Sequence, residues 1–387
     1  MIRRDAHHTL LRLARGFPIV AITGPRQAGK TTLARMAFPD KPYVSLEDPD
    51  MRDMAESDPR GLLSRFPDGA ILDEAQRAPG LFSYLQTLVD SKIRPGMFVL
   101  TGSQQFGLIS GISQSLAGRV GLVQLLPFSI PELAAARRLP KVLDDLLFRG
   151  QYPPIHDREF LPGDWFAGYA TTYVERDVRQ LVNVRDLSTF QRFVKMCAAR
   201  TAQLLNLSSL ASDCGISHNT AASWISVLEA SYIVHLLRPH YRNFNKRLVK
   251  TPKLYFCDTG LAAWLLGIRE KSQLPFHAQR GALFETLVVT EYLKGRLNRG
   301  EPSNLYFWRD SKGLEIDLLL EEGDVLTPVE IKSGQTIVPD FMAGLRKWNA
   351  LSGIPDRPAL LVYGGEREMV NGNVTIVPWK RIPADIH

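Results

Sequence analysis

The pattern with the most specific chemistry is a glycine-rich run near the start of the chain, made of Gly24, Pro25, Arg26, Gln27, Ala28, Gly29, Lys30, Thr31 and Thr32. It fits GxxxxGK(S/T), follows an apolar run and precedes a helix-compatible segment, which is the context in which this motif binds phosphate. Backbone N–H groups of such a loop surround the β-phosphate, Lys30 reaches the β- and γ-phosphates, and the Thr31 hydroxyl ligates Mg²⁺. The sequence therefore predicts a site for ATP and Mg²⁺. The alternative is a glycine-rich turn.

Two adjacent acids, Asp73 and Glu74, close the apolar run Ala70-Ile71-Leu72. At the end of a buried strand, Asp73 can hold the Mg²⁺ shell and Glu74 can activate the attacking water. An acid pair after apolar residues is weak evidence alone. Behind a phosphate loop it supplies the groups that phosphoryl transfer still needs, so we predict Lys30 and Glu74 as catalytic residues and Asp73 as part of the nucleotide and metal site.

Two further polar side chains are spaced to complete this site. Ser103 follows Thr101-Gly102 at the end of the next apolar run, where it can orient the water. Arg119 precedes another apolar run and can project from one subunit into a neighbour's nucleotide to stabilise transition-state charge. A surface or ion-paired arginine is the alternative. An arginine supplied by a neighbour implies a ring of identical subunits, for which we expect a hexamer.

A second set of charged residues lies near the end of the chain. Residues 281–293 have the periodicity of an amphipathic helix in which Glu285 shares the apolar face and Glu291 points away. A carboxylate on a buried face costs free energy unless it is paired, protonated or bound to a cation. Residues 314–320 predict a strand in which Asp317 lies on one face together with Glu315.

Glu330 and Lys332 lie on a second expected strand after a Gly-Asp turn, so they can converge with Asp317. Two acids that ligate Mg²⁺ and a lysine near the attacked phosphate constitute a site for metal-dependent phosphodiester hydrolysis. The order of helix Glu285, strand Asp317 and Glu330-x-Lys332 resembles the restriction-endonuclease-like fold. That resemblance implies Glu285, Asp317 and Glu330 as Mg²⁺ ligands and Lys332 as a catalytic residue. The alternative is an inert domain with a structural ion-pair cluster.

Between these regions the sequence predicts a nucleic-acid-binding module. Residues 207–215 read as a short helix closed by glycine, and residues 218–229 read as a second helix that carries Asn219, Thr220 and Trp224 after the N-cap Ser217. The pattern resembles a helix-turn-helix, and the following strands would form its wing.

Residues 238–253 contain no acid, and aromatic Tyr241 and Phe244 interleave basic side chains, namely Arg238, Arg242, Lys246, Arg247, Lys250 and Lys253. This mixture suits phosphate contacts and stacking on bases or sugars. The residues that we predict to contact DNA are Asn219, Thr220, Arg242, Lys246, Arg247 and Lys250. A winged helix that serves as a spacer between proteins is the alternative.

The elements that must position these groups follow from the apolar pattern. Short apolar runs alternate with helix-compatible segments, which predicts an α/β fold with a parallel sheet covered by helices on both faces; the expected strands are 18–23, 43–46, 69–73, 97–102 and 121–126. We expect four domains: an ATPase core in 1–129, a helical lid and connector in 130–187, a winged helix in 188–256, and a restriction-endonuclease-like α/β domain in 257–387.

The order of phosphate loop, acid pair, polar sensor and arginine resembles the AAA+ class of P-loop ATPases. A closer resemblance, to a prokaryotic family that joins an AAA-type ATPase to a C-terminal domain of unknown function, rests on the motifs LTGSQQF, SLAGRV, LPFSIPEL, YVERDV, NLSSLA, KLYFCDTGLAAWLLGI and WRDSKGLEIDLLL. It implies that Ser103 is the first sensor and Arg119 the arginine finger. Both Arg137 and Arg138 remain open as the second sensor of the lid.

Composition limits the classes of protein to consider. The 387 residues carry 47 Lys and Arg against 40 Asp and Glu, a formal charge of +7, and three cysteines without a disulfide or zinc pattern. Residues 185–253 hold ten basic and three acidic residues, so the whole excess lies in the predicted DNA-binding module. No apolar run reaches the roughly 18 residues that a membrane span needs. The basic N-terminus has no cleavage site, so we expect a cytoplasmic protein.

These observations predict an ATP-hydrolysing, oligomeric AAA+ protein that binds DNA and processes or remodels it. Whether its C-terminal domain is a Mg²⁺-dependent nuclease stays open at this point. The alternative is a nucleotide-dependent switch or scaffold that binds protein partners and whose nuclease-like domain is inactive.

Overall fold

A computed structural model describes residues 2–91, 94–103, 112, 115–172, 186–241, 248–354 and 356–382. The chain forms two compact units. The N-terminal unit comprises Met1–Phe128, Ala230–Tyr232 and Arg296–Pro302, and the C-terminal unit comprises Ser129–Glu229, Ile233–Gly295 and Ser303–His387. The four domains expected from the sequence do not coincide with these units and stay a prediction.

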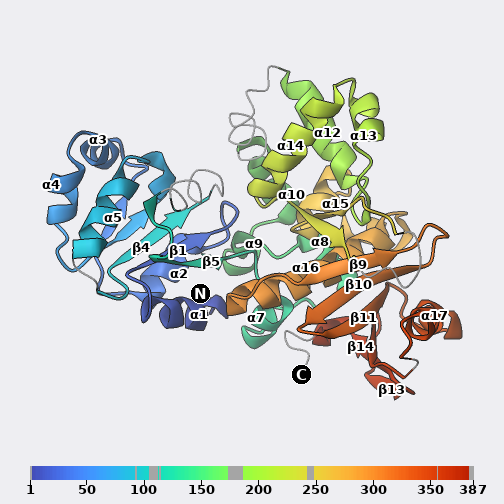
Figure 1. The fold of residues 1–387 in the computed structure, drawn as a ribbon. Coiled ribbons are helices and arrows are strands. Elements are labelled where there is room, and N and C mark those ends of the chain that lie inside the picture. Colours follow the sequence, from blue (N-terminus) through green and yellow to red (C-terminus); the bar gives the residue numbers. More distant parts are fainter. Residues whose placement is uncertain are drawn as a thin grey trace. The chain divides into compact units, whose positions relative to one another are not determined.

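The N-terminal unit is built on a five-stranded parallel sheet with the order β2-β3-β4-β1-β5 (Figure 1). Its strands are β1 (Ile19–Thr23), β2 (Tyr43–Ser45), β3 (Ile71–Asp73), β4 (Phe98–Gly102) and β5 (Val120–Gln124). The five strands and their parallel arrangement confirm the prediction from the sequence. Strands β1 and β4 are buried along their whole length, as expected for a parallel sheet that is covered on both faces.

Helices cover both faces of this sheet, and they are α1 (Ala6–Ala14), α2 (Lys30–Ala37), α3 (Pro49–Ser57), α4 (Pro59–Ser64), the 3₁₀ turn η1 (Ala75–Arg77) and α5 (Leu81–Ser91). Alternate residues of β1 point to opposite faces of the sheet. Val20 and Ile22 pack in one core with α1 and α2, whereas Ile19 and Ala21 pack in the other with α3, α4 and α5. The phosphate loop therefore connects a strand buried on both sides to a helix packed on one of them.

The C-terminal unit contains a nine-stranded mixed sheet with the order β13-β14-β12-β11-β10-β9-β7-β8-β6. Its strands are β6 (Gln203–Leu204), β7 (Val234–Pro239), β8 (Lys253–Phe256), β9 (Leu305–Arg309), β10 (Glu315–Glu322), β11 (Val325–Lys332), β12 (Ala359–Tyr363), β13 (Met369–Asn371) and β14 (Val374–Pro378). Strands β7 and β8, which we expected to form the wing, pair with each other and continue into this sheet, because β7 also pairs with β9. The winged helix stays a prediction.

The helices of the C-terminal unit include the expected helix-turn-helix pair. They are α7 (Ile130–Ala135), α8 (Leu143–Arg149), α9 (Pro153–Asp157), α10 (Pro162–Tyr169), α12 (Leu187–Ala198), α13 (Leu207–Cys214), α14 (His218–Ala230), α15 (Thr259–Leu265), η3 (Lys271–Phe276), α16 (Arg280–Arg299), η4 (Pro339–Met342), α17 (Ala343–Leu351) and η5 (Trp379–Arg381). Gly215 ends α13 with a φ of 68°, and the Ser217 hydroxyl accepts from the Thr220 N–H at 3.1 Å. Both features match the prediction.

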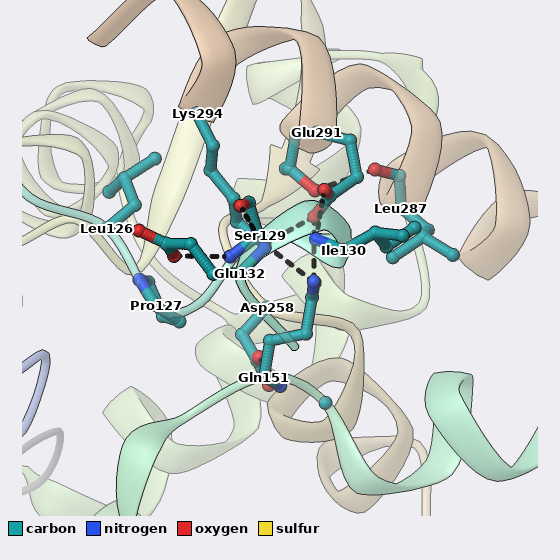
Figure 2. A network of polar contacts seen from close by, with 12 residues as sticks. Leu126, Pro127, Ser129, Ile130, Glu132, Gln151, Asp258, Leu287, Glu291 and Lys294 are labelled. Carbon is teal, nitrogen blue, oxygen red and sulfur yellow. Dashed lines mark hydrogen bonds and ion pairs between the residues drawn. The ribbon is translucent and has the colours of Figure 1, made fainter. Parts of the chain in front are cut away.

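Helix α16 differs from the amphipathic helix expected, because nearly every residue of 283–295 is buried. Glu291, which we expected to point away from the core, is itself buried and accepts hydrogen bonds from the Ile130 N–H at 2.6 Å and the Gln151 amide at 2.7 Å (Figure 2). Lys294 donates to Glu291 at 2.8 Å and to Gln151 at 2.6 Å. The Gln151 N–H donates to Asp258, which caps α15. A buried polar network thus joins α16 to the segments that begin α7, α9 and α15.

Candidate functional sites

The phosphate loop has a backbone that two of its glycines make possible. Gly24 has a φ of 149°, and a Cβ there would lie 2.0 Å from the carbonyl oxygen of Leu125. Gly29 has a φ of 91° and stands directly before α2, so the first N–H groups of that helix face the loop. This is the geometry in which backbone amides surround a phosphate.

Lys30 is the first residue of α2, and its ammonium is buried with only 6% of the residue exposed. It donates to the carbonyl oxygens of Gly24 at 3.0 Å and Pro25 at 2.8 Å. Burial lowers the pKa of Lys30 to about 8, although Glu74 and Asp73 oppose that shift. A buried ammonium that donates to two carbonyl oxygens at the N-terminus of a helix is suited to bind a polyphosphate.

Asp73 gathers hydroxyl groups around its carboxylate. The Thr31 hydroxyl donates to both of its oxygens, at 2.9 and 3.1 Å, and the Tyr43 hydroxyl donates to Oδ2 at 2.7 Å. Thr101 donates to Oδ1. Thr31 and Asp73 therefore present adjacent hard oxygen donors, which are the ligands that Mg²⁺ prefers, so the residues present fit the ion implied by the phosphate loop.

Glu74 is held beside Asp73 in a left-handed conformation with a φ of 54°. Its Oε2 accepts from the Ser103 hydroxyl at 2.9 Å and from the Gln76 amide, and its N–H donates to Thr101 at 3.3 Å. A strained backbone that is fixed by three partners is typical of functional sites. No sequence motif points to Tyr43, Thr101 or Gln76. The fold brings Tyr43 and Thr101 to the acid pair, whereas Gln76 lies only two residues after Glu74.

Two arginines hold the loop in place, one from outside its motif and one from within it. Arg4 is only 5% exposed and donates to the carbonyl oxygens of Ala28 and Leu126, each at 2.7 Å. Arg26, within the loop, pairs with Glu47 at 3.1 Å. Arg4 connects the loop to Leu126, two residues after the end of β5, a role with no local sequence signal.

Arg119 does not join the cluster of Lys30, Thr31, Asp73, Glu74 and Ser103 in this chain. Its guanidinium makes a bidentate ion pair with Asp90, at 2.5 and 2.9 Å, and donates to the Ala117 carbonyl oxygen. This contact lowers the pKa of Asp90 and raises that of Arg119. Of the two candidates for a second sensor, Arg138 pairs with Glu159 and Arg137 has a φ of 56°.

The carboxylates near the end of the chain do converge, but with cations among them. Glu285 accepts from the Lys253 ammonium at 2.9 Å and from the Tyr255 hydroxyl at 2.6 Å. Lys253 also pairs with Glu315, whose other oxygen accepts from Arg309 at 2.9 Å. The face shared by Glu315 and Asp317 on β10 is confirmed by the alternating burial of that strand.

Lys332 lies between the remaining two acids, 2.5 Å from Glu330 and 3.7 Å from Asp317. Asp317 Oδ2 also accepts the Ile331 N–H at 2.9 Å. Burial raises the pKa of Glu285 to about 7 and that of Glu330 to about 8, with the Asp317 charge adding to both shifts. Within the described part of the chain, no group of three His, Cys, Asp or Glu side chains has the arrangement of a metal site. The residues present do not fit the Mg²⁺ ion that the endonuclease-like pattern implies.

The residues predicted to contact DNA differ in their exposure, and three of them lie outside the described part of the chain. Asn219 and Lys250 are exposed, and Thr220 is half-buried with its hydroxyl against Ser217. Arg242, Lys246 and Arg247 lie outside the described residues. Lys253, counted with the basic face, is buried instead. Trp224, which the second helix carries together with Asn219 and Thr220, is also buried and packs edge-on against Phe190 and Phe193.

Comparison with known families divides the chain into three segments. Residues 16–134 match the family described as "AAA domain", residues 140–272 match "Domain of unknown function (DUF8612)", and residues 280–382 match "Domain of unknown function (DUF4143)". The N-terminal segment is therefore an AAA-type P-loop domain. Among the described residues, no helix is long and apolar enough to cross a membrane.

Solved structures resemble the chain only distantly. The Walker-type ATPase PABY2304 of Pyrococcus abyssi is 14% identical with a TM-score of 0.43, over 67% of this chain and 94% of that one. RuvB of Thermotoga maritima is 17% identical with a TM-score of 0.32, over 61% of this chain and 90% of that one.

Two relatives are much more similar. "Uncharacterized protein Rv2008c" of Mycobacterium tuberculosis and "Uncharacterized protein Mb2031c" of Mycobacterium bovis are each 33% identical over 386 residues, which cover 99% of this chain and 84% of the relative. At this identity and coverage, the chain belongs to the same protein family as these two mycobacterial proteins.

Proposed function

We propose that this protein is an ATPase that couples Mg²⁺-dependent ATP hydrolysis in its AAA domain to DNA bound by its C-terminal unit. The observation that carries the proposal is the convergence of five side chains on one loop: a buried ammonium, a hydroxyl beside a carboxylate, and a second carboxylate held by a serine. These groups are Lys30, Thr31, Asp73, Glu74 and Ser103. Each has a separate role in phosphoryl transfer.

In the proposed reaction, the N–H groups at the start of α2 and the Lys30 ammonium bind the β- and γ-phosphates and offset the charge that develops on them. Thr31 and Asp73 hold Mg²⁺, which neutralises phosphate charge when bound. Glu74 accepts a proton from the attacking water, while Ser103 and Gln76 fix the position of its carboxylate. Asp73 accepts from the hydroxyls of Thr31 and Tyr43 and Glu74 from that of Ser103, so Asp73 serves the metal and Glu74 the attacking water.

We infer that Arg119 acts on a neighbouring subunit's nucleotide in a ring, most simply a hexamer, after it leaves Asp90. A partly exposed surface ion pair costs little to break, so the pairing in one chain is compatible with this role. The test is to mix Arg119→Ala with Glu74→Gln, two variants that should each be inactive alone. Recovered turnover in the mixture supports a shared site, whereas full activity of Arg119→Ala alone rules it out.

The DNA part of the proposal rests on the segment around β7 and β8. Arg238 and Lys250 are exposed, and Tyr241 is 79% exposed beside His240, with which it stacks. Exposed aromatic and basic side chains on one segment provide stacking and phosphate contacts. The helix pair α13 and α14 would present Asn219 to the same ligand.

The test of the whole proposal is ATP turnover by the purified chain, alone and with linear, single-stranded or branched DNA. Stimulation by one DNA topology supports a DNA-processing machine. Turnover that no DNA changes, with a response to a protein partner, would favour the nucleotide-dependent switch or scaffold instead. The contacts of Lys253 among the C-terminal carboxylates favour an inert nuclease-like domain under either function.

A further inference from the structure

The cluster on α16, β8, β10 and β11 has an internal cation at its centre. Lys253 is 3% exposed, and its ammonium contacts Glu285 at 2.9 Å and also pairs with Glu315. Asp317 lies close enough to add to the electrostatic field at this ammonium. Two of these acids, Glu285 and Asp317, are the ones that the endonuclease-like pattern assigns to a metal ion.

Lys253 is fixed in this position by its strand and its surroundings. It begins β8, which pairs with β7 on one side and with β6 on the other. Its ammonium stands 5.6 Å from the ring centre of Phe307, and only 4% of its side chain is exposed. The lysine is therefore a built part of the core, unlike a surface side chain that could swing away when a metal arrives.

One carboxylate oxygen of each acid that the pattern assigns to a metal already accepts a hydrogen bond from the protein. Glu285 Oε1 accepts from both Lys253 and Tyr255, and Asp317 Oδ2 accepts the Ile331 N–H. Glu330 Oε1 accepts from Lys332, and its Oε2 is buried without a hydrogen bond. Four carboxylates face three cations, so a single proton would balance the cluster; the cations are Lys253, Arg309 and Lys332.

We propose that the Lys253 ammonium is the resident cation of this carboxylate cluster and stands where a nuclease would hold its divalent metal. The ion cluster then joins strands β8, β10 and β11 to helix α16 as a structural element of the sheet. A buried ammonium is stable only while its carboxylate partners remain paired with it. The same carboxylates therefore cannot serve both as the structural ion cluster and as ligands of a divalent metal. This proposal does not depend on ATP hydrolysis.

Binding of Mn²⁺ to the nucleotide-free, full-length chain tests it, with Mn²⁺ detected by electron paramagnetic resonance. Wild-type protein and Asp317→Asn should bind the same amount of Mn²⁺, because the wild type has no Mn²⁺ site that uses Asp317. In Lys253→Met the uncompensated carboxylates should gain such a site, and Mn²⁺ should raise the Tm of this variant by at least ~3 °C while leaving that of the wild type unchanged. Lys250→Met, an exposed neighbour on the same segment, is the matched control and should behave like the wild type.

Stoichiometric Mn²⁺ binding by the wild type that is lost in Asp317→Asn would overturn the proposal. Mn²⁺-dependent DNA cleavage that is lost in Lys332→Ala would overturn it as well. If Lys253→Met does not fold, the comparison of the wild type with Asp317→Asn decides the question alone. ATP turnover of all the folded variants reports separately on the AAA domain, so failure of one proposal can be told from failure of the other.

Discussion

At the scale of single residues, the buried ammonium of Lys30 sets how ATP binding depends on pH. Its pKa is lowered to about 8 by burial, from an ordinary value of 10.5. Phosphate next to it favours the charged form, so binding should raise this pKa and take up protons when the pH is near or above 8. Affinity should therefore fall as the pH rises through 8. Calorimetry at pH 8.5 in buffers of different ionisation enthalpy measures the uptake.

Lys30→Arg is the matched control for this prediction, because a guanidinium stays protonated over the whole range. The variant should bind ATP without the uptake of protons assigned to Lys30. Equal proton uptake by Lys30→Arg and the wild type would contradict the assignment.

A second prediction for a single residue concerns the contribution of Arg4 to stability. Removing its guanidinium in Arg4→Met leaves the buried carbonyl oxygens of Ala28 and Leu126 without these donors. Each unsatisfied group costs roughly 1–3 kcal/mol, so the loss of both should lower the free energy of unfolding by about 2–6 kcal/mol. Urea denaturation followed by circular dichroism measures it. Arg3→Met, at the exposed neighbouring position, should change stability by less than about 0.5 kcal/mol, and equal losses for the two variants would refute the role of Arg4.

At the scale of elements, the network around α16 in Figure 2 predicts a non-additive pair of variants. Glu291→Leu leaves the buried Lys294 ammonium without its carboxylate and should cost about 3–5 kcal/mol. The double variant Glu291→Leu with Lys294→Met removes both charges and should be more stable than the sum of the two single losses implies. A double-mutant cycle by urea denaturation measures the coupling, and strict additivity would contradict the pairing.

The sequence predicted the elements whose pattern is local. The five parallel strands follow from short apolar runs, the phosphate loop from its glycines, and the α13–α14 pair from Gly215 and Ser217. In each case neighbouring residues determine the conformation, so no contact with a distant element is needed to recognise it.

What the sequence could not predict depends on distant partners. Periodicity assigned Glu291 to solvent, but α16 is covered on nearly all sides, and the polar face contacts Gln151. The strands expected as a wing extend the large sheet because β7 pairs with β9, a register that no local pattern encodes. Lys253 was counted with the basic residues of 238–253 for the same reason: its charge is visible in the sequence, and its carboxylate partners are not.

At the scale of the whole molecule, the excess of positive charge predicts how the protein binds DNA. Arg242, Lys246 and Arg247 belong to the segment that carries the formal +7. Changing all three to Glu should abolish DNA binding and leave basal ATP turnover intact. Filter binding across a salt series should show, for the wild type, an affinity that falls steeply with ionic strength because counterions are released.

The matched control changes three exposed lysines elsewhere, Lys271, Lys312 and Lys347, to Glu. It shifts the net charge by the same amount, so equal loss of binding in the two triple variants would show that only the total charge matters. An affinity of the wild type that does not respond to salt would argue against phosphate contacts altogether.

The central claim is that the AAA domain binds ATP through Lys30 and hydrolyses it through Glu74. The most direct measurement is the identity of the nucleotide recovered from protein after one incubation with labelled ATP and Mg²⁺. Wild-type protein should yield ADP and phosphate, Glu74→Gln should retain intact ATP with turnover at least ~100-fold slower, and Lys30→Ala should retain little of either nucleotide. Hydrolysis by Glu74→Gln at the wild-type rate, or undiminished binding by Lys30→Ala, would contradict the account.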